Sequence, residues 1–318
     1  MGRRRFGCLR ITLFGNFRVS YEEEPCEIAL TRTAQALLAF LLLNRQRLHS
    51  REVLAGLFWG DHTEDQARNC LSTALWRLRR LVEPDDVERG TYLLATPNGD
   101  VGFNERSDYW LDVAIFEQTA GTLLSRPSAS FTSDEVQSTE HALTLYRGEL
   151  LEGFQDEWAL SERERLHAVY MRALGHLMAY HRREGDLERS LLYGQRILRA
   201  EPLREEVHRD VMRLYAQAGQ RALAAQQYEL CRQLLLRELG IEPMIETQSL
   251  IAEIMRQDTP AAPALEPPAN PNSNTVVAAP SPSLQQALDV LRLAQGQLQR
   301  AIAIAEQLLK GDHTPGAM

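Results

Sequence analysis

The apolar and polar positions of the chain fall into short β-leaning runs over the first thirty residues and into helical periods afterwards. Residues 9–20 (LRITLFGNFRVS) are interrupted by Gly15-Asn16, a pattern typical of two short strands joined by a turn. Glu27 to Leu30 predict one further short strand. These segments together predict a small antiparallel sheet.

Three helices are predicted next. TAQALLAFLLLN (33–44) is mostly apolar, which indicates a buried helix. REVLAGLFW (51–59) follows Ser50, a favourable N-cap residue, and has an acid in its first turn. The third helix is predicted to begin near Glu64 or Asp65 and to end at Val82.

A hairpin follows the third helix. Its strands are predicted at 91–96 and 100–104, and Pro97-Asn98-Gly99 joins them. Asn-Gly between β-leaning runs is a strong hairpin signal. Short strands, three helices and a hairpin, in this order, predict a winged helix-turn-helix domain over residues 8–106, with Asn98 and Gly99 at the tip of its wing.

The pattern is helical almost throughout after Asp112. Gly185 and Gly219 are 34 residues apart, and each lies in a turn between two predicted helices. This period is typical of tetratricopeptide repeats. We therefore expect a mainly α protein, with an α+β winged helix followed by a tetratricopeptide-like bundle over residues 110–257. The helices are predicted at 112–124, 134–147, 156–184, 187–200, 203–218, 221–239 and 243–256.

Residues 258–283 are rich in proline and alanine, a composition that favours extended, mobile chain. Beyond this linker, residues 284–310 predict an amphipathic helix with a heptad pattern of apolar positions. The helix could form a homodimer, fold back on the bundle or bind another protein. The residues expected at its oligomerisation seam are Leu288, Leu291, Gln295, Leu298 and Ile302.

The helix over 66–82 (QARNCLSTALWRLRRLV) has two unlike faces. It carries four arginines and no acid, although the whole chain has a net charge of −8. At 100° per residue its apolar side chains fall on one arc, which predicts a core face. The core face comprises Ala67, Leu71, Ala74, Leu75, Leu78, Leu81 and Val82.

The opposite arc is polar, with Trp76 at its centre and Arg77 at its edge. A solvated helix face normally mixes charges of both signs, and a fully exposed tryptophan suggests that it stacks on something. Asn, Ser, Thr and Arg are the side chains that contact base edges and phosphates, and an α-helix fits the major groove of B-DNA. We therefore predict a DNA recognition helix; the alternatives are a solvated face or a protein-docking face. The predicted DNA contacts are Arg68, Asn69, Ser72, Thr73, Trp76, Arg77, Arg79 and Arg80.

These motifs resemble a known family. The run REVLAGLFW, followed by ARNCLSTALWRLRR, resembles the OmpR-type winged helix of the Streptomyces antibiotic regulatory proteins. The segments YWLDVAIFE (109–117), LYRGELLEGF (145–154), EWALSERERL (157–166) and ELGIEP (238–243) resemble the bacterial transcriptional activator domain. The resemblance implies a transcription activator that binds double-stranded promoter DNA and contacts RNA polymerase.

The sequence departs from the larger relatives, because it has no GxxxxGK[ST] loop of an ATPase module. No cofactor and no metal are expected, since the eight histidines and four cysteines show no metal-ligand spacing. No catalytic constellation is present, so we do not expect an enzyme. Without an apolar run of about 18 residues or a signal-peptide pattern, we expect a cytoplasmic protein that does not bind membranes. The alternative function is a tetratricopeptide-like interaction module whose winged helix does not read DNA.

Overall fold

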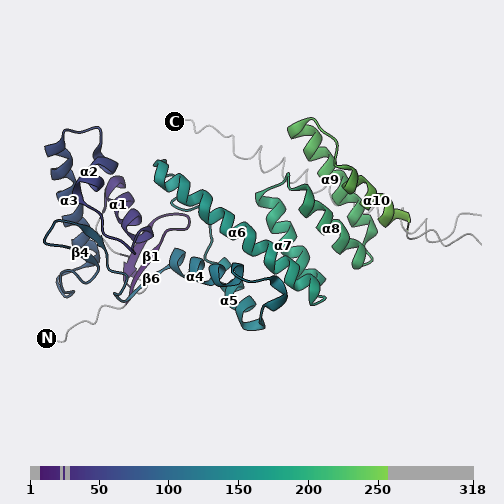
Figure 1. The fold of residues 1–318 in the computed structure, drawn as a ribbon, viewed down its shortest axis with the longest axis horizontal. Coiled ribbons are helices and arrows are strands. Elements are labelled where there is room, and N and C mark those ends of the chain that lie inside the picture. The colour runs from purple at the N-terminus through teal and green to yellow at the C-terminus, as the bar shows by residue number, and fades with distance from the viewer. Residues whose placement is uncertain (1–7, 22–23, 26–28, 257–318) are drawn as a thin grey trace, which may run out of the picture. The chain divides into compact units, whose positions relative to one another are not determined.

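The computed structural model describes residues 8–21, 24–25 and 29–256, all of which belong to one compact unit (Figure 1). The predicted linker at 258–283 and the predicted heptad helix at 284–310 lie outside the described residues. Leu288, Leu291, Gln295, Leu298 and Ile302 belong to that segment.

A four-stranded sheet begins the fold, in the order β3-β2-β1-β6. The strands are β1 (Leu9–Thr12), β2 (Arg18–Tyr21), β3 (Glu24–Pro25) and β6 (Tyr109–Leu111). β1 pairs antiparallel with β2 and parallel with β6. The inward-facing Leu9 and Ile11 are fully buried, so one face of the sheet covers the core.

Two strand predictions need correction. Ala29 and Leu30 are not in a strand, because they lead into Thr31, whose side chain caps the next helix, and the third strand lies at Glu24–Pro25 instead. β6 was not predicted: it has three residues, and its pairing with β1 joins segments about a hundred residues apart.

The three predicted helices are α1 (Arg32–Leu43), α2 (Arg51–Trp59) and α3 (Glu64–Val82). Side-chain caps fix where they begin, because the hydroxyls of Thr31 and Ser50 accept the amides of Ala34 and Val53. The hairpin β4 (Leu93–Ala95) and β5 (Val101–Phe103) follows α3, as predicted. Sheet, three helices and hairpin form the winged helix.

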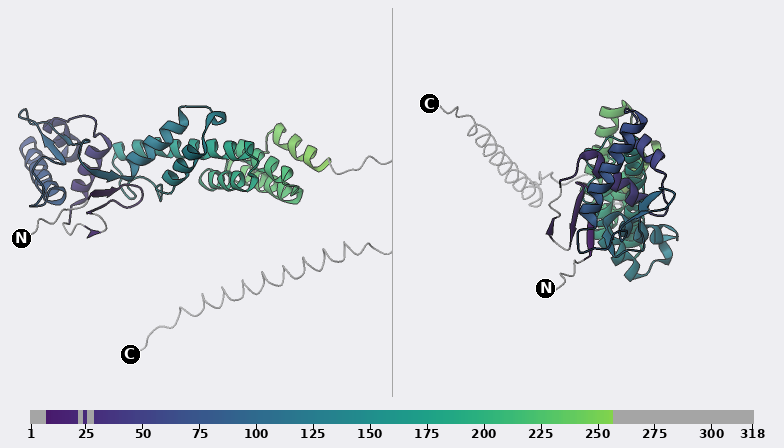
Figure 2. Two further views of the ribbon diagram at one scale, coloured as in Figure 1. Left: turned by 90° about the horizontal axis from the view of Figure 1, so that it is seen from below. Right: turned by 90° about the vertical axis from the view of Figure 1, so that its left-hand side faces the viewer.

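The rest of the described chain is helical, and its helices follow the predicted order. α6 packs on α7, α7 on α8 and α8 on α9, so successive helices form antiparallel hairpins (Figures 1 and 2). Gly185 and Gly219 have positive φ angles of 80° and 73° in the turns, where a side chain would be strained. The helices are α4 (Asp112–Leu124), α5 (Ser133–Leu143), α6 (Glu157–Arg183), α7 (Leu187–Ala200), α8 (Glu205–Gln217), α9 (Arg221–Leu239) and α10 (Ile245–Arg256), with a 3-10 turn at Ser128–Ser130.

One hydrophobic core runs from the sheet into the helical hairpins. Phe40 of α1 packs edge-on against Trp158 of α6, with ring centroids 5.4 Å apart, and Phe14 packs against Phe116 of α4 at 5.3 Å. The winged helix and the first helices of the bundle therefore share a core.

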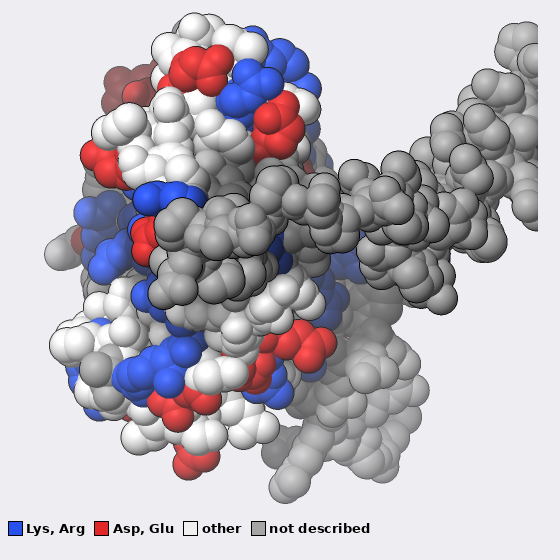
Figure 3. All heavy atoms as spheres, turned by 90° about the vertical axis from the view of Figure 1, so that its right-hand side faces the viewer, with Lys and Arg blue, Asp and Glu red and all other residues white. Residues whose placement is uncertain are grey.

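Several apolar side chains are exposed around the turn between α9 and α10. Figure 3 faces this end of the fold and shows charges of both signs scattered among uncharged residues. The exposed apolar side chains there are Leu236, Leu239, Ile241, Met244 and Ile245.

Candidate nucleic-acid interface

α3 is anchored on the core by one face. All seven side chains predicted for its core face are buried. A reciprocal capping box between Thr63 and Gln66 fixes the first turn, and Glu64 and Asp65 favour the helix N-terminus. Packing against α1 and α2 then holds the helix in place.

The opposite face of α3 is solvent-exposed. Trp76 is 57% exposed, and the Arg80 guanidinium lies 5.1 Å from the centroid of its ring, a cation–π contact within reach of solvent. Arg77 is half-buried at the edge of this face. The remaining exposed side chains of the predicted set are Arg68, Asn69, Ser72 and Thr73.

The expectation of a purely positive face is wrong at both ends of α3. Arg68 pairs with Glu64 one turn earlier, and Arg79 pairs with Glu83 one turn later. Both acids lie just outside residues 66–82, which is why that stretch alone gave the wrong picture. Arg77 and Arg80 keep their charge unpaired among the described residues.

The hydroxyls on this face are partly engaged. Thr73 Oγ1 donates to the carbonyl of Asn69 at 3.0 Å, and Ser72 Oγ donates to that of Arg68 at 2.9 Å. Each hydroxyl donates its hydrogen to a carbonyl of the preceding turn, and the lone pairs of its oxygen remain able to accept a hydrogen bond. Thr73 therefore offers a ligand an acceptor and a methyl group.

Glu83 connects the end of α3 to the hairpin. Its side chain is 2% exposed and pairs with Arg79 at 2.9 Å. The other carboxylate oxygen accepts the backbone amides of Gly90, Tyr92 and Leu93, at 2.8 to 3.1 Å. Arg79 is thus part of the joint between recognition helix and wing, with only 18% of its side chain exposed.

The wing tip carries the two predicted residues. Asn98 is exposed, and Gly99 adopts a φ of 91°, which only glycine tolerates easily. The amide of Gly99 donates to the Thr96 carbonyl at 2.9 Å and closes the turn. The tip itself has no basic side chain, as the sequence indicated.

Arg51, the first residue of α2, supplies the charge that the wing lacks. Its guanidinium donates to Ser72 Oγ at 2.8 Å, and a Cβ built on Gly99 would lie 3.6 Å from its Cδ. Arg51 therefore lies between α3 and the wing. Sequence reasoning missed this residue, because its only signal is a position directly after the N-cap Ser50.

The positive charge here comes from arginines. Burial lowers the pKa of His49, which precedes α2, so His49 is neutral at pH 7. In the described part of the chain, no group of three or more histidine, cysteine or acidic side chains could hold a metal ion. No described helix has both the length and the apolar content needed to span a bilayer.

Comparison with known proteins agrees with this arrangement. Residues 111–255 match the model of the bacterial transcriptional activator domain, and residues 24–99 match that of the C-terminal domain of transcriptional regulatory proteins. The chain therefore carries a transcriptional-regulator C-terminal domain followed by a bacterial transcriptional activator domain. The resemblance inferred from the sequence is thereby confirmed.

Several regulatory proteins are similar along most of the chain. The regulatory protein AfsR of Streptomyces coelicolor is 26% identical over 79% of the chain, and AfsR of Streptomyces griseus is 28% identical over 81%. The chain spans only about a quarter of the length of these two relatives. The transcriptional regulatory protein MoaR1 of Mycobacterium tuberculosis is 24% identical, over 71% of the chain and 73% of MoaR1.

A solved structure shows the same fold. Mycobacterium tuberculosis EmbR, in complex with a low-affinity phosphopeptide, aligns with a TM-score of 0.62 at 20% identity. The alignment covers 78% of this chain and 65% of that one. At this identity the likeness concerns the fold alone.

Proposed function

We propose that this chain is a sequence-specific DNA-binding regulator that activates transcription from promoters, and not an enzyme. The observation that carries the proposal is the exposed Trp76–Arg80 pair on α3, the helix whose other face is anchored in the core. Burying a large exposed aromatic side chain against a ligand is favourable, and an arginine held by stacking suits bidentate contact with a guanine edge.

The side chains divide by what they offer DNA. Asn69, Thr73, Trp76 and Arg80 would face base edges and sugars in the major groove, and Ser72 would act as an acceptor. Arg51, Arg68 and Arg77 would contact phosphates, and Asn98 and Gly99 would approach the backbone beside the wing. Arg79 is left out of this set, because it is paired with the buried Glu83.

The test is binding of the full chain to its own upstream DNA between about 50 and 200 mM salt. The double variant Trp76→Ala, Arg80→Ala should lose selective binding. The matched control is Leu192→Ala, Arg199→Ala, which removes an exposed apolar side chain and an exposed arginine from α7 and should bind like the wild type. Equal, unselective binding by all three proteins would refute the proposal.

The second candidate function is a protein-interaction module, because the Trp76–Arg80 pair could equally anchor a partner protein. A DNA-binding protein loses affinity steeply with salt, through release of counterions. A protein that fails to bind DNA at low salt but captures a partner through Trp76 would favour this alternative.

Contact with RNA polymerase is proposed for α2. Val53 and Leu57, one turn apart, are 58% and 45% exposed although they are apolar. The variant Val53→Ser, Leu57→Ser should keep the DNA affinity and lose activation in transcription with purified polymerase. Loss of DNA affinity as well would assign these residues to the winged-helix fold instead.

A homodimer through residues 284–310 and a cytoplasmic location stay predictions. The variant Leu291→Ser, Leu298→Ser tests the dimer, because it places two polar side chains on the predicted seam. We expect the wild type to have twice the monomer mass and the variant to be monomeric, by light scattering. A monomeric wild type would instead favour a helix that folds back on the bundle.

A further inference from the structure

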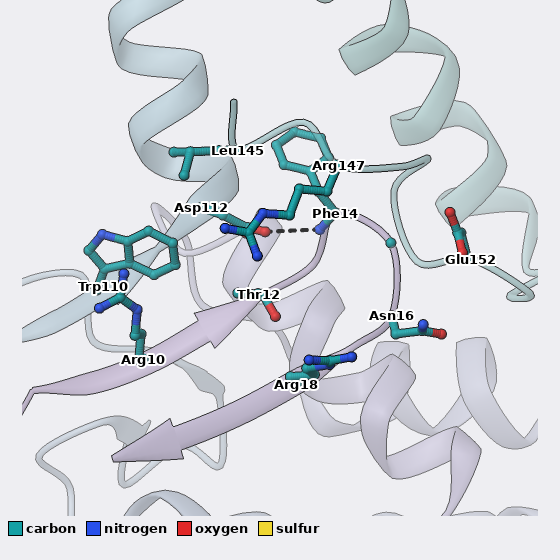
Figure 4. Close-up of a pocket in the computed structure, with 11 residues that line it drawn as sticks. Arg10, Thr12, Phe14, Asn16, Arg18, Trp110, Asp112, Leu145, Arg147 and Glu152 are labelled. Carbon is teal, nitrogen blue, oxygen red and sulfur yellow. Dashed lines mark hydrogen bonds between the residues drawn. The ribbon is translucent and has the colours of Figure 1, made fainter. Parts of the chain in front are cut away.

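A pocket of about 330 Å³ lies on the outer face of the sheet (Figure 4). Alternation along β1 directs Leu9 and Ile11 into the core and Arg10 and Thr12 to the outside. Trp110 of β6 is the register partner of Arg10, and Arg18 of β2 is the partner of Thr12. The three strands therefore present these side chains on one face.

The other wall of the pocket is the segment between α5 and α6, which contributes Leu145, Arg147 and Glu152. Backbone bonds join this segment to the end of β1: Gly15 donates to the Glu149 carbonyl, and Leu151 donates to the Leu13 carbonyl, both at 2.8 Å. The pocket thus lies where the winged helix meets the helical bundle, next to α4 and away from α3.

Three arginines converge on this pocket without an acidic partner. Arg10 lies over the ring of Trp110, with 4.1 Å between its guanidinium carbon and the ring centroid, so the strand face holds its charge in place. Figure 4 shows Arg147 extending from the opposite wall, above Asp112 and Phe14. Among the described residues, Arg10, Arg18 and Arg147 form no ion pair, whereas most other arginines on the helices do.

Two carboxylates also line the pocket, and neither forms an ion pair with Arg10, Arg18 or Arg147 among the described residues. Asp112 is 2% exposed, and its oxygens accept the backbone amides of Leu13, Phe14 and Val113 at 2.7 to 3.0 Å. These bonds occupy its acceptor sites. Glu152 lies on the side of the pocket opposite Trp110 (Figure 4).

We propose that this pocket binds a small phosphorylated molecule, with Arg10 and Arg18 on one side and Arg147 on the other. Guanidinium groups bind phosphate through paired hydrogen bonds, and three arginines against two carboxylates leave the cavity with a net positive charge that favours an anion. The volume is at the lower end for small-molecule sites, which suits a phosphate or diphosphate with a small organic group. The ligand would bridge the winged helix and the bundle and stabilise their joint.

The test uses inorganic pyrophosphate as the probe and the full chain as the protein. Binding is measured by calorimetry and by the melting temperature, against sodium chloride of matched ionic strength. We expect saturable binding with one site per chain and a melting temperature raised by several degrees. The melting temperature rises because a ligand that binds only the folded state stabilises that state.

Two variants, each from one wall, localise the site. Arg10→Gln and Arg147→Gln should each weaken pyrophosphate binding at least tenfold. The matched controls are Arg89→Gln and Arg199→Gln, which change exposed arginines outside the pocket and should bind like the wild type. The melting temperature of each variant without ligand shows that it is folded.

Three results would overturn the proposal. Pyrophosphate could act no differently from matched chloride, or the control variants could lose binding as much as the pocket variants. Alternatively, Arg10→Gln and Arg147→Gln could weaken DNA binding while the wild type fails to bind pyrophosphate, which would make this surface a contact for the DNA backbone. None of these results depends on whether α3 reads bases, so the two proposals fail separately.

Discussion

At the scale of single residues, the charges on the exposed face of α3 are not equivalent. Arg68 forms an ion pair with Glu64, and Arg79 forms an ion pair with the buried Glu83. Arg80 stacks on Trp76 and forms no ion pair with another described residue, so its donors are available to a ligand. Arg51 reaches the same surface from α2 through Ser72.

Arg51 and Arg80 should therefore differ in what they contribute to DNA binding. Arg51→Ala should weaken binding similarly on all sequences and reduce the slope of log affinity against log salt by about one, as expected for one lost phosphate contact. Arg80→Ala should cost about 1–3 kcal/mol of discrimination at one base pair. Competition between the upstream site and single-base variants of it, over a salt series, measures both quantities.

The opposite result would assign base reading to Arg51 and the phosphate contact to Arg80. If Arg51→Ala relaxed base preference and Arg80→Ala only lowered the salt slope, base reading would lie between α3 and the wing. Arg89→Ala, an exposed arginine beyond α3, controls for the general loss of one positive charge.

His208 gives the helical bundle a defined pH response. It is 1% exposed; its Nε2 donates to the Pro202 carbonyl at 2.9 Å, and its Nδ1 accepts from Gln227 at 2.6 Å. Both bonds suit the neutral ring. Burial lowers its pKa below the ordinary 6.5, so the unfolded chain takes up this proton more readily than the folded one.

Stability from this group is therefore present above pH 6.5 and is lost as the pH falls towards the lowered pKa of the folded state. His208→Gln should reduce the slope of unfolding free energy against pH between about 7.5 and 5.5, as measured by urea denaturation. Some slope should remain, because burial also lowers the pKa values of His49 and His176. An unchanged slope in His208→Gln, or an equal loss in the exposed His141→Gln, would contradict the assignment.

At the scale of elements, α3 is fixed at both ends by side chains other than those proposed to contact bases. The Thr63–Gln66 capping box fixes its start. Glu83 fixes its end and also accepts three amides at the start of the hairpin. Helix and wing are therefore held in one geometry before any DNA is bound.

Removing the Glu83 carboxylate should loosen this joint. We expect Glu83→Ala to lower the unfolding free energy by about 3 kcal/mol, because it leaves buried amides and Arg79 without their partner. Glu83→Gln keeps one acceptor oxygen and should cost less. As the control, the exposed Glu88→Ala should remain within about 0.5 kcal/mol of the wild type in the same urea titration. An equally small change in Glu83→Ala would show that Glu83 does not hold α3 and the hairpin together.

At the scale of the whole molecule, one hydrophobic core joins the winged helix to the first helices of the bundle, and a second, smaller cluster of Met212, Ala224 and Ile254 lies among the last helices. Trp158 of α6 packs against both Phe40 and Phe58 of the winged helix. β6, which directly precedes α4, completes the first sheet. Trp158 therefore joins the bundle to α1 and α2, the two helices on which α3 packs.

Trp158→Ala should uncouple the unfolding of the winged helix from that of the helical bundle. We expect the wild type to unfold in one calorimetric transition, because the main core extends from the winged helix into the bundle. The variant should lose about 3 kcal/mol and show two transitions, since the cavity lies at the contact between the parts. Trp158→Phe should retain the single transition; two transitions already in the wild type would show that the contact does not couple them.

The sequence alone determined the elements whose signals are local. Helical periodicity and caps placed α2, α4 and α7 at their observed bounds. The Asn-Gly pair marked the hairpin, and the periodicity of residues 66–82 separated the buried side of α3 from its exposed side. These features follow from spacing along a single helix or turn, so no distant contact was needed.

Only the tertiary structure decided which arginines remain accessible to a ligand. Arg79 and Glu83 are a local i,i+4 pair, but Glu83 is buried because it also accepts amides of the hairpin, and the approach of Arg51 to Ser72 depends on how α2 packs on α3. β6 and the arginine pocket both require strands about a hundred residues apart to align. Such contacts depend on the packing of distant segments, which periodicity within one segment does not specify.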